Sequence, residues 1–235
     1  MIVTQSAEIC SFLPNEDGTL TLIDTEGKPV GHESYNSVGY MRRSGKPKIL
    51  RSVVRKPDDG VGENPWLKYD KIGFVDTNSQ DQGGRRLFVC SPSLLLWQDA
   101  SRSTGNVHHV DLLVGYCANE SNPERAGWFD FVQRVQESGV LEATDRILLV
   151  VDSEKAAIPR INGRIQPIFG DFVLPELFTM AYATSDAGAE NWINAEMRRR
   201  DRVAARAMAS IRADKRFLEI LSESGSLYIK NTFER

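Results

Sequence analysis

Two aspartates in this 235-residue chain directly follow short apolar runs. Asp152 follows the run at 146–151, whose five consecutive apolar residues predict a strand buried on both faces of a sheet. Asp76 follows a similar run at 71–75, and small polar residues come after each aspartate. An ionised carboxylate is costly to bury unless it is paired or coordinates a cation. The two runs therefore predict strands that deliver carboxylates to a cation site at the edge of a mixed sheet.

A third acid, Glu124, lies at the start of a predicted helix. Asn122 and Pro123 are typical of a helix start, where Asn caps the first turn and Pro takes the first helical position. Trp128 and the apolar residues that follow it at helical spacing mark the buried face of this helix. Glu124 lies four residues before Trp128, so we expect it on the same face, directed at the sheet edge.

The segments around these acids predict alternating strands and helices. After the first strand, the turn at 81–84 returns the chain as a second strand and a third follows, which is an antiparallel meander. The expected elements are strands at 71–75, 86–90 and 107–116, a helix from 122, strands at 146–151 and 178–182, and a helix at 189–213, with 158–170 irregular. This pattern predicts an α/β fold.

The first 68 residues are expected to form a β-rich extension. Residues 19–23 alternate polar and apolar side chains after the turn signal Asp17-Gly18. The loop at 57–65 is the best internal boundary. We therefore predict an extension at 1–68, a core at 69–213 and a C-terminal helical tail at 214–235.

One stretch of this extension is strongly basic, although the chain has a formal net charge of −3. Between residues 41 and 56 there are seven cations and no acid: Arg42, Arg43, Lys46, Lys48, Arg51, Arg55 and Lys56. Such a run forms either a solvated hairpin or a contact with a phosphate backbone. The run Arg198-Arg199-Arg200 allows the same two interpretations.

Composition places the chain among ordinary soluble globular proteins, with 41% hydrophobic and 26% charged residues. The net charge excludes a wholly basic protein, so any nucleic-acid surface must be local. The three cysteines fit no metal-ligand spacing and are interpreted as free thiols in a reducing compartment. Neither a signal peptide nor a membrane-spanning run is recognised, so we expect a cytoplasmic protein without a membrane partner.

The order of these motifs resembles the ribonuclease H-like superfamily, over about residues 70–210. Four motifs carry the resemblance in the family's order: Asp76-Thr77-Asn78-Ser79 before Gly83-Gly84, Asn122-Pro123-Glu124, Val151-Asp152-Ser153, and Asn194 followed by Asp201-Arg202-Val203-Ala204. The resemblance implies a type 1 ribonuclease H-like core, which is a mixed five-stranded sheet with flanking helices. The β-rich extension at 1–68 lies outside it.

The resemblance also implies a metal-dependent nuclease that hydrolyses phosphodiester bonds, with RNA or an RNA–DNA hybrid as the favoured substrate. Enzymes of this kind hold two divalent cations about 4 Å apart, and carboxylate ligands suit Mg²⁺ or Mn²⁺. Asp76 is expected to bridge both ions, Glu124 and Asp152 each to hold one, and Asp201 to complete the second. The basic residues at 41–56 are the expected contacts to nucleic acid.

Three alternatives stay open at this point. The loop before the family's last helix carries a His, but residues 184–188 have none here, so Asp186 or Glu190 is a substitute for Asp201 as the final acid. A catalytically degenerate module that binds nucleic acid or a partner protein is the second alternative. A PIN-type nuclease is the third, although that fold passes from its first strand straight into a helix, whereas residues 86–90 return as a strand.

Overall fold

A large mixed sheet forms the centre of the protein. The structure, a computed structural model, describes residues 11–14, 20–23, 54–55, 65–102, 105–118, 121–185 and 192–231. The five central strands lie in the order β7 (Leu112–Cys117), β5 (Arg85–Trp97), β4 (Lys71–Gln82), β8 (Ile147–Val151) and β9 (Phe178–Ala183). β5 is antiparallel to β4 and β7, whereas β4, β8 and β9 are parallel. A mixed five-stranded sheet flanked by helices is what the resemblance implied, so the expected α/β fold class is confirmed.

The predicted meander is present, but its strands differ from their predicted lengths. β4 continues past Asp76 to Gln82, so Asp76 lies inside a strand and not at its end, and β5 extends from Arg85 to Trp97. Gly83 and Gly84 have φ angles of 58° and 81°, so they make the expected turn from β4 to β5. The expected strand at 107–116 is divided into β6 (Gly105–His109) and β7. Both pair with β5, because β5 is thirteen residues long and accepts β6 along 93–97 and β7 along 86–90.

Further strands widen the sheet beyond the five that were expected. β1 (Ser11–Pro14), β2 (Leu20–Ile23) and β10 (Ser226–Lys230) follow β7 on one side, and β3 (Val54–Arg55) pairs with β9 on the other. The tail at 214–235 therefore contains a strand as well as a helix. Nothing in the sheet tests the boundaries at 68/69 and 213/214, which stay predictions. The basic residues at 41–56 lie outside the described residues, apart from the backbone of Arg55 in β3.

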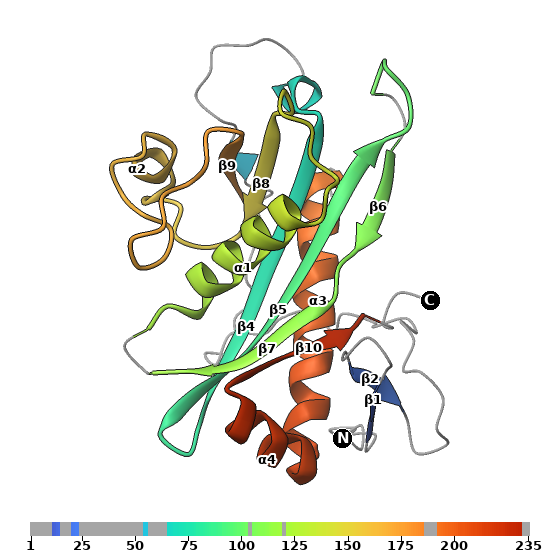
Figure 1. Cartoon of the computed structure of the whole chain (residues 1–235), viewed down its shortest axis with the longest axis vertical. Coiled ribbons are helices and arrows are strands. Elements are labelled where there is room, and N and C mark those ends of the chain that lie inside the picture. Colours follow the sequence, from blue (N-terminus) through green and yellow to red (C-terminus); the bar gives the residue numbers. More distant parts are fainter. Residues whose placement is uncertain are drawn as a thin grey trace, which may run out of the picture.

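The helices cover both faces of the sheet (Figure 1). They are the 3₁₀ helix η1 (Pro65–Lys68), α1 (Pro123–Glu137), α2 (Ile158–Asn162), α3 (Trp192–Ala213) and α4 (Lys215–Ser224). The short helix α2 corrects the expectation that 158–170 is entirely irregular. None of the helices in the described part of the chain combines the length and apolar character that a membrane span requires.

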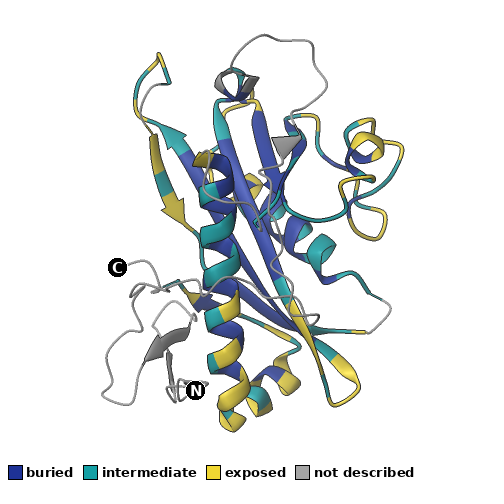
Figure 2. Cartoon of the chain, turned by 180° about the vertical axis from the view of Figure 1, so that it is seen from behind, coloured by how far each residue is buried: buried dark blue, intermediate teal, exposed yellow. Residues whose placement is uncertain are grey.

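Strand alternation divides the apolar core between the two faces. All five residues of β8 are buried, as its apolar run predicted. Leu149 and Val151 pack in the cluster that contains Trp128 of α1, whereas Leu148 and Val150 pack in the cluster that contains Met197 of α3. Burial continues along the middle of the sheet and gives way to exposed residues at the β4–β5 hairpin (Figure 2). β4 and β8 are therefore held between α1 and α3.

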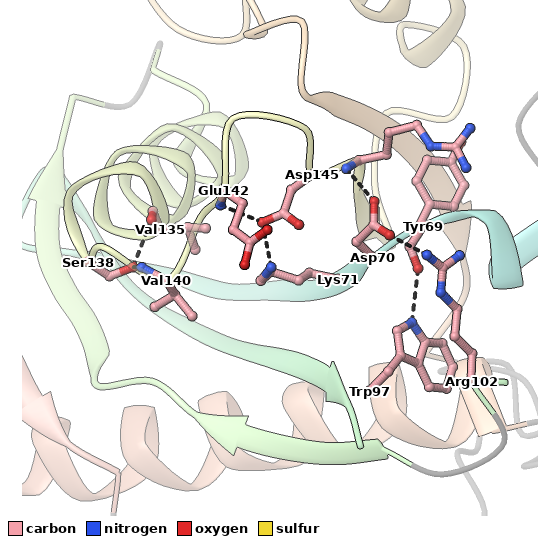
Figure 3. A network of polar contacts seen from close by, with 11 residues as sticks. Tyr69, Asp70, Lys71, Trp97, Arg102, Val135, Ser138, Val140, Glu142 and Asp145 are labelled. Atoms are coloured by element: carbon pink, nitrogen blue, oxygen red, sulfur yellow. Dashed lines mark hydrogen bonds and ion pairs between the residues drawn. The ribbon is translucent and has the colours of Figure 1, made fainter. Parts of the chain in front are cut away.

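A polar network joins the starts of β4 and β8 (Figure 3). The backbone N–H of Arg146 donates to Asp70 Oδ2 at 2.8 Å, and Asp70 is ion-paired with Arg102. Lys71 Nζ lies 2.5 Å from Asp145 Oδ2. These contacts fix where the two parallel strands begin, and the strands then run side by side for five residue pairs. Their register decides which residues meet at the other end.

Candidate active site

Asp76, within β4, and Asp152, directly after β8, occupy neighbouring positions on two adjacent strands. Val75 pairs with Val151 in the parallel register, and β8 ends there, so Asp76 and Asp152 are the next pair of positions. Asp76 is only 3% exposed. Burial raises the pKa of Asp76 well above its ordinary value, and the charge of Asp152, a hydrogen bond with it, and the charges of Glu124 and Asp201 raise it further. The structure thus brings together the acids that the motifs singled out.

Glu124 reaches this place from the first turn of α1. The Asn122 side chain caps the helix by accepting the Glu124 N–H at 3.0 Å, as predicted. Burial, followed by the charge of Asp152, raises the pKa of Glu124 to about 8. The hydroxyls of Ser153 and Thr77 lower it slightly. Glu124 is therefore largely protonated at neutral pH when no cation is present.

Three buried oxygens around Glu124 have no hydrogen-bond partner of normal geometry. They are Glu124 Oε2, Thr77 Oγ1 and Ser153 Oγ. The two hydroxyls lie close enough to influence the carboxyl group without forming well-aligned hydrogen bonds. A buried oxygen without a partner is costly, and a bound cation would satisfy Glu124 Oε2. The residues present therefore fit a hard divalent cation.

An ion pair fixes α1 to the loop after β8. Arg125 Nη2 lies 2.5 Å from Glu154 Oε2, and Arg125 Nε donates to both carboxylate oxygens at 2.9 and 3.0 Å. The Asn122 amide donates to the same carboxylate. Glu154 has a φ of 47°, a left-handed conformation that costs free energy in a non-glycine residue. The Glu154 contacts thus hold Glu124 near Asp152.

Gly127 allows α1 to lie close to the sheet below Glu124. A Cβ at this position would lie 2.7 Å from Cys90 Sγ and 2.8 Å from Thr77 Oγ1. We expect Gly127→Ala to lower the free energy of unfolding by about 1–2 kcal/mol, because overpacking costs about 1–3 kcal/mol and the gain in helix propensity offsets less than that. The same displacement should move Glu124 and reduce activity. Chemical denaturation and cleavage rates measure the two effects.

The control for Gly127→Ala is the same substitution in a Cys90→Ala background. Removing the Cys90 sulfur removes the shorter of the two close contacts. If overpacking displaces α1, Gly127→Ala should lower the free energy of unfolding less in the Cys90→Ala background than in the wild type. Equal losses in both backgrounds would contradict this explanation.

Asp201 reaches the cluster from the opposite face of the sheet, in the middle of α3. The Nδ2 atom of Asn78 lies 3.0 Å from the Asp201 carbonyl oxygen and 3.2 Å from Asp201 Oδ1. Strand alternation places Asn78 on the same face as Asp76, and the charge of Asp201 acts on Asp76. Asn194 ties the first turn of α3 to the end of β9 by donating to the Thr184 carbonyl at 2.9 Å.

Of the three candidates for the final acid, Asp201 is the one that the structure describes. Asp186 and Glu190 lie outside the described residues, so Asp186 as the substitute ligand stays a prediction. Asp201 is the acid whose interaction with Asp76 is observed. On the loop after β9, Ser185 Oγ donates to Asp152 Oδ2 at 2.5 Å. Sequence reasoning missed Ser185 as a site residue.

The Arg198–Arg200 run fits neither of its two interpretations as a whole. The Arg200 side chain is fully buried, and its Nε lies 2.9 Å from Glu196 Oε1. Ser93 Oγ on β5 donates to the same oxygen at 2.9 Å. Arg200 is therefore a core residue that pairs with Glu196, the residue that joins α3 to β5, and is neither a solvated side chain nor a phosphate contact.

The four acids do not form a closed ligand set. Within the described ranges, no group of three or more His, Cys, Asp and Glu side chains is arranged closely enough to hold one metal ion. The interactions of Asp76 with Asp152, Glu124 and Asp201 nevertheless place all four acids around one buried position. Like charges repel, so carboxylates without a counter-ion lie further apart than ligands of one cation. Cation binding thus requires them to move closer.

Comparison with known proteins gives a likeness at the level of structure. No protein-family model matches the sequence, and no curated protein sequence matches it. The solved structure of LC11-RNase H1, isolated from compost by a metagenomic approach, is 12% identical with a TM-score of 0.36. The likeness covers 60% of this chain and 99% of that chain.

Proposed function

We propose that the protein is a metal-dependent nuclease that hydrolyses phosphodiester bonds with two divalent cations. The observation that carries the proposal is the environment of Asp76. This carboxyl group is buried, and burial and the neighbouring acids Asp152, Glu124 and Asp201 all raise its pKa. Acids rarely gather around a buried carboxyl group unless a cation binds among them. Oxygen ligands of this kind suit Mg²⁺ or Mn²⁺.

Each acid takes a separate role in this proposal. Asp76, on which the charges of the other three acids act, would be a ligand of both cations; Glu124 and Asp152 would each hold one, and Asp201 would complete the second. Ser185 orients Asp152 by its hydrogen bond, and the ion pair between Arg125 and Glu154 keeps Glu124 in place. When bound, the cations supply activation of the attacking water and stabilisation of the leaving oxygen.

The substrate of this proposal is a nucleic acid, with RNA or an RNA–DNA hybrid favoured by the resemblance. Val54–Arg55 ends the basic stretch at 41–56 and pairs with β9, and Arg55 lies in register with Tyr182. Tyr182 is in turn in register with Val151, the residue before Asp152. Two strand spacings of about 4.8 Å, or about 10 Å in all, therefore separate the backbone of Arg55 from that of Val151. This placement supports a role for the cations of the basic stretch in holding the phosphate backbone.

The alternative function is a degenerate module that binds nucleic acid or protein without cutting. The open spacing of the acids favours this alternative, since no three described acids are arranged as a metal site. The two functions differ in what Mg²⁺ does. A nuclease needs the cation for turnover, whereas a binding module loses nucleic acid as salt rises and shows no cutting.

A cleavage assay separates the two functions. Labelled single-stranded RNA, duplex DNA and RNA–DNA hybrid are incubated with the protein in Mg²⁺, in Mn²⁺ or in EDTA. We expect cutting in the presence of either cation, none in EDTA, and at least a roughly 100-fold lower rate for Asp152→Asn. Asp171→Asn is the matched control, because Asp171 is an exposed aspartate. Cutting that persists in EDTA or in Asp152→Asn would contradict the two-metal proposal.

A further inference from the structure

Asn78 is a polar residue of β4 that was not predicted to be a site residue. It lies two residues after Asp76, and its side chain contacts Asp201, which is 123 residues away in the chain. We infer that Asn78 is a positioning residue, which holds the Asp201 carboxylate beside Asp76 so that both can bind the second cation. This inference rests on the proposed function and names the residue on which the fourth ligand depends.

The hydrogen-bond geometry shows why an amide suits this position. Asn78 Nδ2 carries two hydrogens, and it lies within hydrogen-bond distance of two acceptors on Asp201, the backbone oxygen at 3.0 Å and Oδ1 at 3.2 Å. The contact with the backbone oxygen fixes the position of β4 along the axis of α3, and the contact with Oδ1 orients the carboxylate. The two contacts together link the Asp201 carboxylate to the strand that carries Asp76.

The charges around Asp201 show why such a contact is needed. The negative charges of Asp201 and Asp76 disfavour each other. Asp201 is half-buried, so its side chain has room to turn toward water and away from Asp76. A hydrogen-bond donor on Oδ1 favours the ionised form and opposes that rotation. Asn78 thus compensates part of the repulsion while leaving the net negative charge that a cation requires.

Two substitutions at Asn78 separate hydrogen bonding from shape. Asn78→Leu keeps the approximate size of the side chain and removes both donors. Asn78→Asp keeps the shape and polarity but replaces the donors by an acceptor that repels Asp201. Loss of an outer-shell partner of a metal ligand typically costs about 10–100-fold in affinity. We expect Asn78→Leu to lower the affinity for Mn²⁺ at the weaker of the two sites by a factor in this range, and Asn78→Asp to lower that affinity further.

Calorimetric titration of the full chain with Mn²⁺ alone measures this effect without depending on cleavage. In an Asp201→Ala background, Asn78→Leu should cause no further loss of Mn²⁺ affinity, because its effect acts through Asp201. Asn162→Leu is the matched control. Its amide also joins a helix to a strand, with Nδ2 donating to the Met180 carbonyl at 2.9 Å and Oδ1 accepting the Met180 N–H at 2.7 Å. It should lower the Tm and leave Mn²⁺ binding unchanged.

The outcomes distinguish failure of the inference from failure of the proposed function. Two-site Mn²⁺ binding by the wild type, with the weaker site lost in Asn78→Leu and kept in Asn162→Leu, supports the inference. Wild-type affinity in both Asn78 variants overturns the inference and leaves the proposed function intact. If Asn78→Leu fails to fold, Asn78→Asp gives the same decision. Absence of Mn²⁺ binding by the wild type overturns both.

Discussion

Replacing Asp76 by Asn is expected to abolish metal-dependent cleavage and to make the metal-free protein more stable. The loss of activity should be at least about 100-fold. Asp76 is a proposed ligand of both cations, and replacing even a residue that only contacts a metal ligand typically lowers metal affinity or activity about 10–100-fold. The gain in stability follows from burial. The unfolded chain ionises Asp76 at neutral pH, whereas the folded chain must keep it protonated or bury a charge beside three acids.

The expected gain in stability is about 1–2 kcal/mol, the range of single stabilising substitutions. For a chain of this size it corresponds to a Tm increase of a few degrees in EDTA. Asp145→Asn is the matched control, since Asp145 is a buried aspartate that has a cation partner, with Lys71 Nζ at 2.5 Å. That substitution should lower the Tm. A decrease in Tm for Asp76→Asn would contradict the proposed strain among the acids.

Raising the pH from about 4.5 to about 8 is expected to destabilise the metal-free protein through Glu124. The pKa of Glu124 is about 8 in the folded chain, against an ordinary value of 4.5. Below pH 4.5 the carboxyl group is protonated in both states, and its contribution to stability is fully present. Between the two values only the folded state holds the proton, so stability falls as pH rises and the contribution is lost once pH passes about 8. A tenfold change in an ionisation constant corresponds to about 1.4 kcal/mol, so the total loss is a few kcal/mol.

Glu124→Gln isolates this effect. The amide does not titrate, so between about pH 5 and about pH 8 the Tm of the variant should fall less than the Tm of the wild type in EDTA. Saturating Mg²⁺ should stabilise the wild type more at about pH 8 than at about pH 6, because cation binding requires the ionised carboxylate and releases its proton. Parallel Tm curves for wild type and variant in EDTA would show that Glu124 has an ordinary pKa.

The parts of the site that the sequence predicted depend on local signals. The buried strand β8 was predicted from five consecutive apolar residues, and Asp152 follows it directly. The start of α1 was predicted from Asn122 and Pro123, whose cap the structure confirms. Position along a strand or helix then placed Asp76 and Glu124, because side-chain direction is periodic in both elements. These predictions needed no knowledge of how distant segments pack.

The parts that were missed depend on contacts between distant segments. Asn78 contacts a residue 123 positions away in the chain. The sequence shows only that Asn78 lies two residues after Asp76, and so on the same face of the strand, which is a weak indication by itself. Arg200 lies in a run of three arginines that looks solvated, yet it is buried and ion-paired with Glu196 on the same helix, and Glu196 in turn accepts a hydrogen bond from Ser93 on β5. The tail was predicted to be helical, and its last part forms the strand β10 instead, because pairing with β7 depends on tertiary packing.

The most direct test of the central claim is anomalous diffraction at the manganese edge from crystals soaked in Mn²⁺. We expect two peaks about 4 Å apart, with Asp76 between them, Glu124 and Asp152 each beside one, and Asp201 beside the second. Asp76→Asn crystals should lose both peaks. Wild-type crystals without a peak at the acids, or with manganese bound elsewhere, would contradict the proposal that these four carboxylates form a two-metal site.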